Sequence, residues 1–278
     1  MKRKLIDVPI QYESIIKTAF ITRTKSINDF KERDFKRLIK AVRDSGIKNR
    51  YVLSDIDKDN YLVPDTDLTV TVIKDKNPTS AISLNKALQR IREDDVNPKA
   101  FLISSQEVIL TDDHINRLIK VLNDDPTLLV AGYKFTIKDE ELNSELQWYY
   151  ARKKLIAFKV PWNTCALWNY KLFDKYVEEF DEITTKNPFN PVCVCIDNVC
   201  SQTEHVGMED GLAIAKALTQ NERLKYKLIS ADPPLCWKVN VDRINEHRKK
   251  LARKDTVMRD FMEVKKYSID KSRNARME

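Results

Sequence analysis

A predicted buried strand in this sequence ends in a cluster of polar residues. The run 100–103 is apolar, and it is followed by Ser104, Ser105, Gln106 and Glu107. In open α/β sheets, ligands bind just beyond the carboxyl ends of the strands, so side chains at this position are the ones that would meet a substrate. The hydroxyl, amide and carboxylate groups of residues 104–107 therefore mark a candidate binding edge.

A second candidate is the acidic pair Glu209-Asp210, which directly precedes an apolar helical run. Gly207 and Gly211 flank this pair, and they are two of only four glycines in 278 residues. Carboxylates are among the side chains that move protons in catalysis. A carboxylate at this position can also serve only to stabilise the helix, because the N-terminus of a helix carries a partial positive charge. The sequence leaves both interpretations open.

The low glycine content excludes two common nucleotide sites. With glycine only at Gly46, Gly132, Gly207 and Gly211, neither G-x-G-x-x-G nor G-x-x-x-x-G-K-[ST] can be written. A nucleotide site in this chain must therefore use side chains instead of a glycine-rich loop.

The elements that must position these residues follow from hydrophobic periodicity. Strands and amphipathic helices alternate through the first two-thirds of the chain, which predicts an α/β sheet with crossover helices. From residue 148 the chain is more aromatic and less regular, with an expected loop at 184–200. The predicted strands are 18–21, 51–53, 68–73, 100–104, 128–135 and 225–230, and the predicted helices are 30–42, 80–91, 111–122 and 208–218.

The net charge of +7 lies mostly at one end of the chain. Residues 241–278 hold 12 Lys and Arg against 7 Asp and Glu, so residues 1–240 carry only about +2. A segment such as 248–254 can bind an anionic membrane surface, although its interleaved acids are more typical of a solvated helix face. Nucleic-acid binding is disfavoured, because no recognised nucleic-acid module accompanies the charge.

The sequence favours a cytoplasmic location. Residues 1–12 lack the apolar stretch of a signal peptide, and no run of 18 apolar residues occurs elsewhere. The chain has five cysteines, an odd number, and three of them crowd into residues 193–200, which suits reduced thiols better than disulfides. Peripheral membrane contact through residues 241–278 is the alternative location.

Three short segments, in this order, resemble the GT-A glycosyltransferases, in particular the family-two-like enzymes that use sugar nucleotides. They are Ile21-Thr22-Arg23-Thr24, Val52-Leu53-Ser54-Asp55-Ile56-Asp57 and Asn77-Pro78-Thr79-Ser80-Ala81-Ile82-Ser83-Leu84-Asn85. The resemblance spans about residues 18–220 and implies a nucleoside-diphosphate sugar donor. The nucleotide-binding residues that it implies are Thr22, Arg23, Asp55, Asp57, Asn85, Ser104 and Ser105.

The sequence departs from this family at the metal site. The family's Asp-x-Asp falls on residues 104–107, where both aspartates are missing and Glu107 is the single acid. Mg²⁺ and Mn²⁺ need hard oxygen ligands, and one carboxylate among hydroxyls and amides binds them weakly. Glu107 and His205 are the remaining candidate ligands. A second Asp-x-Asp at Asp65-Thr66-Asp67 precedes a strand instead of ending one, which is more typical of a solvated turn.

The second half of the chain resembles the acceptor side of the family. The segment 160–169 contains Trp162 and Trp168, whose rings can stack on the apolar face of a sugar or can simply pack in the core. The segment 207–215 resembles the family's Glu-Asp helix start. That resemblance implies that Asp210 is the general base of an inverting transfer and that Glu209 orients it.

We therefore expect a GT-A-like α/β fold with a mixed, mostly parallel sheet flanked by helices. Residues 1–240 would form this domain, with a nucleotide half at about 13–135 and an acceptor half at about 136–240, and residues 241–278 a basic helical extension. The expected activity is transfer of a sugar to an acceptor hydroxyl. The alternative is a non-catalytic binding or scaffold protein with a degenerate GT-A fold that has lost its metal site.

Overall fold

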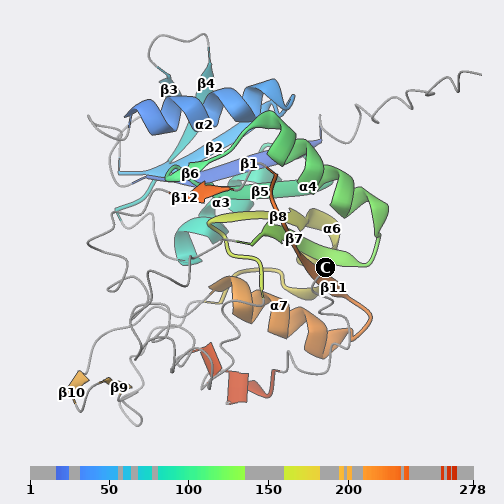
Figure 1. The fold of residues 1–278 in the computed structure, drawn as a ribbon. Helices are drawn as coiled ribbons and strands as arrows, with labels where there is room; N and C mark the ends of the chain where they lie inside the picture. Colours follow the sequence, from blue (N-terminus) through green and yellow to red (C-terminus); the bar gives the residue numbers. More distant parts are fainter. Residues whose placement is uncertain are drawn as a thin grey trace, which may run out of the picture.

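A computed structural model describes residues 17–24, 32–55, 59–63, 68–76, 81–134, 160–181, 194–196, 199–201, 209–232, 235–237, 258–259, 262–263 and 265–267. Its centre is a sheet with the strand order β11-β7-β8-β5-β1-β2-β4-β3 (Figure 1). Only β8 and β3 run against the direction of the other six strands. The strands are β1 (Thr18–Arg23), β2 (Asn49–Ser54), β3 (Asn60–Leu62), β4 (Thr69–Lys74), β5 (Ala100–Ser105), β7 (Leu128–Tyr133), β8 (Cys165–Asn169) and β11 (Lys225–Ile229).

The middle strands are apolar on both faces, as a sheet covered by helices on both sides requires. Ala19 and Ile21 of β1 point into one core, and Phe20 between them points into the other. The first core lies under α3 (Ala81–Glu93), α6 (Tyr170–Tyr176) and α7 (Glu209–Gln220). The second lies under α2 (Glu32–Asp44) and α4 (Asp112–Asp124), so the molecule has three layers (Figure 1).

Two smaller sheets accompany the central one. In the first, β6 (Val108–Ile109) pairs antiparallel with β12 (Cys236–Trp237), which brings the backbone of residues 236–237 beside the segment that follows β5. The second is a hairpin of β9 (Val194–Ile196) and β10 (Val199–Ser201).

The predicted fold class is confirmed: the sheet is mixed, mostly parallel and flanked by helices. All the elements predicted between residues 18 and 135 are present, with ends shifted by a few residues. The expected loop at 184–200 contains β9 and the start of β10, and β3 and β6 were not predicted. These strands are two or three residues long, too short for an alternating pattern to appear in the sequence.

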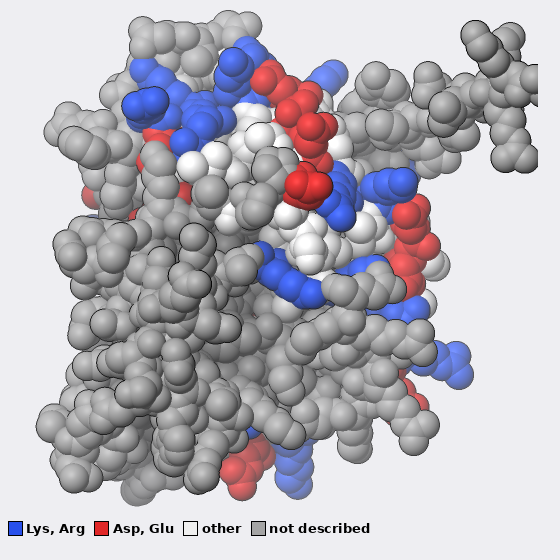
Figure 2. Space-filling model, viewed as in Figure 1, with Lys and Arg blue, Asp and Glu red and all other residues white. Residues whose placement is uncertain are grey.

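The charged C-terminal segment contributes to the core through its described residues. Met258 and Met262, one helical turn apart, are buried with the α3, α6 and α7 core. Among the described residues, no helix combines the length and the apolar character that crossing a membrane requires. On the face seen in Figure 2, Lys and Arg gather over α2 with Asp and Glu beside them.

Gly132 in β7 allows the chain before β8 to pack tightly against the sheet. A Cβ atom at this position would lie 2.7 Å from Pro161 Cβ and 3.0 Å from the Cys165 carbonyl oxygen. We expect Gly132→Ala to lower the free energy of unfolding by about 1–3 kcal/mol, because the close contact forces the backbone to move. Urea denaturation measures this loss.

A double-mutant cycle provides the control. Pro161→Gly removes the Cβ atom nearest to the new methyl group, so the effect of Gly132→Ala should be smaller in that background. Additive effects of the two substitutions would show that the contact with Pro161 is not the cause.

Candidate active site at the carboxyl edge of the sheet

The ends of β1 and β5 lie side by side. Thr22 pairs with Ser104 and Arg23 with Ser105 in the parallel ladder, and the Thr22 hydroxyl donates a hydrogen bond to the Ser104 carbonyl at 2.7 Å. Thr22 is fully buried, and Ser104 is 1% exposed. Thr22 and Ser104 are therefore the last buried residues of β1 and β5, and the polar residues that follow them mark the edge of the sheet.

The start of β8 meets the same edge, because β8 runs antiparallel to β5. Ser104 pairs with Cys165, and the Ser105 amide donates to the Thr164 carbonyl at 2.9 Å. The Ser104 hydroxyl donates to the same carbonyl at 3.3 Å. Asn163, the next residue back along the chain, thus comes close to the predicted binding edge.

Asp210 is held by backbone amides on both carboxylate oxygens. The Asn163 amide donates to Oδ2 and the Gly211 amide to Oδ1, each at 2.8 Å. The Asp210 side chain belongs to the first turn of α7, and the residue is only 5% exposed. The carboxylate is therefore oriented between the helix N-terminus and the segment before β8, where the helix dipole favours its charge.

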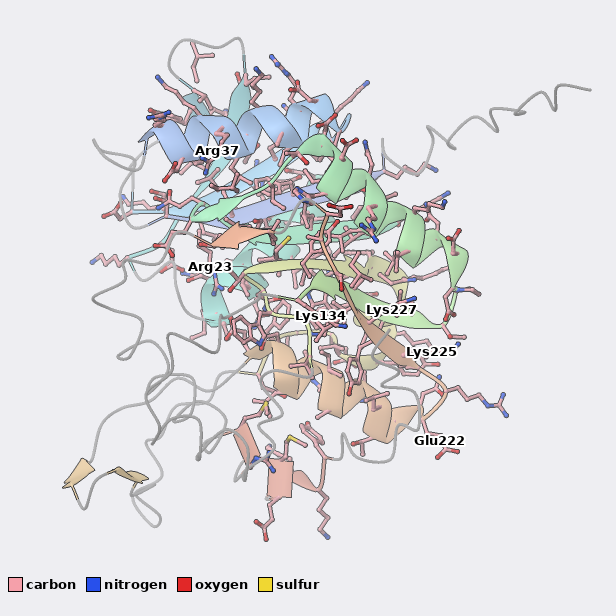
Figure 3. The ribbon with its side chains drawn as sticks, in the orientation of Figure 1. Arg23, Arg37, Lys134, Glu222, Lys225 and Lys227 are labelled. Atoms are coloured by element: carbon pink, nitrogen blue, oxygen red, sulfur yellow. The ribbon has the colours of Figure 1, made fainter. Side chains whose placement is uncertain are left out.

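Glu209 connects the same helix to β1. Its Oε1 lies 3.3 Å from Arg23 Nη1, and the two side chains are 8% and 21% exposed. Figure 3 shows Arg23 at one edge of the sheet and Glu222 at the far end of α7. Of the residues predicted from the sequence, the structure thus brings Arg23, Glu209 and Asp210 together with the Ser104-Ser105 strand end.

Trp168 is part of the core. It is fully buried, its ring stacks on Phe101 at 6.2 Å between centroids, and Phe173 and Phe180 meet it edge-on, each at 5.4 Å. Trp162 belongs to the same core and is 7% exposed. The structure supports the packing alternative, since stacking on a sugar needs an exposed ring face that Trp168 does not have.

Three other predicted nucleotide-binding residues, Asp55, Asp57 and Asn85, have different surroundings. Asp55 is exposed directly after β2, and Asp57 lies outside the described residues. Asn85 in α3 donates through Nδ2 to the Phe180 carbonyl at 2.9 Å and accepts from the Phe180 amide at 2.8 Å. Both ends of this side-chain amide thus connect α3 to the segment after α6.

The described residues do not fit a divalent cation. No group of three or more His, Cys, Asp or Glu side chains within them could hold a metal ion. In the turn after β5, Glu107 is the single carboxylate among residues 104–107. His205, like Asp65 and Asp67, lies outside the described residues, so its role as a ligand stays a prediction.

Cys165 is not available as a nucleophile. It is fully buried at the start of β8, and burial raises the pKa of its thiol to about 12. The thiolate is the reactive form, so this side chain is inert at neutral pH.

Two residues at this edge were missed as site residues in the sequence. Asn163 is a buried amide, and Asp75 follows β4 in the way that Asp55 follows β2. Asp75 Oδ2 accepts from the Ser83 hydroxyl at 2.9 Å and from Lys86 Nζ at 2.8 Å. The rule that polar residues at strand ends form sites could have identified Asp75.

Comparisons with known proteins find solved structures that are similar to this chain at low sequence identity. No protein-family model and no curated protein matches the chain. One similar solved structure is a mannosyltransferase, PcManGT from Pyrobaculum calidifontis, in complex with GDP-Man and Mn²⁺. It is 12% identical with a TM-score of 0.42, over 92% of this chain and 77% of that one. Another is a CMP:2-keto-3-deoxy-manno-octonic acid synthetase complexed with CTP. It is 10% identical with a TM-score of 0.45, over 85% and 99% of the two chains. At these values, neither similarity supports an assignment of activity.

Substitution of Trp168 tests its assignment to the core. Its indole N–H donates to Asn163 Oδ1 at 3.0 Å, so Trp168→Phe leaves a buried acceptor without its donor. We expect the free energy of unfolding to fall by about 1–3 kcal/mol, measured by urea denaturation. Unchanged stability together with weaker binding of a sugar ligand would instead support the stacking role.

Proposed function

We propose that this protein is a glycosyltransferase that moves a sugar from a nucleoside-diphosphate sugar to an acceptor hydroxyl, with inversion at the anomeric carbon. The observation that carries the proposal is the orientation of the buried Asp210 carboxylate by the Asn163 and Gly211 amides. In an inverting transfer, one carboxylate takes the proton of the acceptor hydroxyl as its oxygen attacks the sugar. Asp210 is our candidate for this base.

The surroundings of Asp210 suit this role. Its carboxylate is held at the carboxyl edge of the parallel strands, where ligands bind in open α/β sheets. The Arg23–Glu209 pair lies beside it, so the positively charged guanidinium of Arg23, a residue of the proposed nucleotide half, lies at the same edge of the sheet. Arg23 is 21% exposed through its side chain, and we propose that it contacts the diphosphate of the donor.

Nucleotide titration tests the donor half of the proposal. We expect UDP or GDP to bind the purified chain. We expect the dissociation constant to change little between Mn²⁺ and EDTA, because the described residues supply no cation site. Isothermal titration calorimetry under both conditions measures this. Absence of binding to either nucleotide would refute the enzyme proposal, and binding only with Mn²⁺ would show that residues such as His205 complete a metal site.

Substitution of Asp210 tests the base. We expect Asp210→Asn to reduce sugar transfer, or hydrolysis of a nucleotide sugar with water as acceptor, by roughly 10²- to 10⁴-fold while nucleotide affinity is kept. Asp210→Glu keeps a carboxylate for the two amides but moves it by one methylene, so it should also lose most activity. Release of UDP or GDP measures the rate.

The matched control is Glu222→Gln, an exposed acid in the turn after α7. It removes the same charge from the other end of the helix and should leave the rate unchanged (Figure 3). A fully active and folded Asp210→Asn protein would remove Asp210 from the role of base.

A non-catalytic binding protein is the second candidate function. It is favoured by the turn after β5, where the described residues offer one carboxylate and two hydroxyls in place of an acid pair. A protein of this kind would bind a nucleotide sugar without turning it over. Tight binding by the wild-type chain, with no release of UDP or GDP over hours, would favour this alternative.

A further inference from the structure

Two buried amide side chains at the sheet edge each have one atom without a hydrogen-bond partner in the described structure. They are Gln106, which is 5% exposed and has a free Oε1 acceptor, and Asn163, which is 2% exposed and has a free Nδ2 donor. Leaving such groups unpaired away from water is costly, so most buried polar groups in proteins are paired. Both amides therefore lack the kind of partner that a ligand can provide.

The two amides come from adjacent segments. Gln106 directly follows Ser105, whose amide binds the Thr164 carbonyl, and Asn163 directly precedes Thr164. One backbone hydrogen bond thus joins the turn after β5 to the segment before β8, one residue away from Gln106 and from Asn163 along the chain. The backbone amide of Asn163 also donates to the Asp210 carboxylate, so Asn163 is in direct contact with the proposed base.

The orientation of the Asn163 amide is fixed by Trp168. The indole N–H can only donate, and it donates to Asn163 Oδ1 at 3.0 Å. Rotating the amide by half a turn would place its NH₂ group against the indole N–H, with two donors facing each other. Nδ2 is therefore the end of this side chain that is left to bind a ligand.

We propose that Gln106 and Asn163 form an uncharged subsite that binds hydroxyl groups of the donor sugar. Asn163 Nδ2 donates to a hydroxyl oxygen, and Gln106 Oε1 accepts a hydroxyl hydrogen. The subsite rests on the proposed function, because the sugar is that of the nucleotide-sugar donor. Gln106 lies in the turn where the family resemblance implies a metal.

The chemistry of the two free atoms selects this class of ligand. A phosphate dianion offers only acceptors, so it would leave Gln106 Oε1 unpaired. A metal cation requires acceptors, so it would leave Asn163 Nδ2 unpaired. A sugar presents several hydroxyls, each of which can donate and accept, so one sugar can supply both the acceptor for Asn163 Nδ2 and the donor for Gln106 Oε1.

The experiment compares nucleotide sugars with free nucleotides. Gln106→Met removes the acceptor at similar length, and Asn163→Asp keeps Oδ1 for the Trp168 N–H but removes the donor. The probes are UDP-glucose, GDP-mannose, UDP and GDP, titrated calorimetrically into each full-length variant. We expect each variant to weaken binding of the preferred nucleotide sugar, relative to its free nucleotide, by roughly three- to tenfold.

A stability measurement separates this role from a structural one. Without ligand, Gln106→Met should lower the melting temperature less than removal of a paired side chain does, because the Oε1 acceptor that it removes has no partner in the described structure. The matched control is Asn169→Ala at the other end of β8, where Asn169 Oδ1 accepts from the Leu172 amide and caps α6. That substitution should lower the melting temperature and leave the ratio of the two affinities unchanged.

The outcomes distinguish this inference from the proposed function. If the wild-type chain binds no nucleotide sugar, the proposed function is wrong, and the proposed subsite is wrong as well. If the wild-type chain binds one and both variants keep the wild-type ratio of affinities, the subsite is wrong while the proposed function stands. If Gln106→Met lowers the melting temperature as much as Asn169→Ala does, Gln106 is paired inside the protein and the subsite is also wrong.

Discussion

The hydrogen bond from the Asn163 amide to the Asp210 carboxylate is the contact on which the candidate site depends. Both residues are almost fully buried, so loss of the carboxylate would leave a buried N–H unpaired. The bond joins α7 to the segment before β8, and the neighbouring Glu209–Arg23 pair joins α7 to β1. Three segments far apart in sequence are thereby held at one edge of the sheet.

The antiparallel direction of β8 makes this contact possible. A parallel strand at this place would bring its last residues to the carboxyl edge, but β8 brings the residues that precede it. These residues lie close against β7 because Gly132 has no side chain to separate the two segments. The position of Asn163 is therefore a consequence of sheet topology together with one small residue in the adjacent strand.

The sequence predicted those features of the structure that depend on residues close together in the chain. Periodicity predicted the longer strands and helices from residue 18 to 135, and the rule about strand ends located Ser104 and Ser105. The roles of Asn163 and Gln106 depend on the pairing of β5 with β8, some 60 residues apart, which no local pattern encodes. The same holds for Trp168 and Asn85, because their partners Phe101 and Phe180 are identified only by the folded chain.

The charges at this edge are largely balanced within the protein. Glu209 is paired with Arg23, and Asp75 with Lys86, while the amides of Gln106 and Asn163 carry the unpaired atoms. The two neutral amides discriminate between ligands by the geometry of hydrogen bonds more than by net charge, because they gain partners that the chain does not supply. Hydroxyl-rich ligands suit such an edge. The excess positive charge of the sequence lies mainly in residues 241–278.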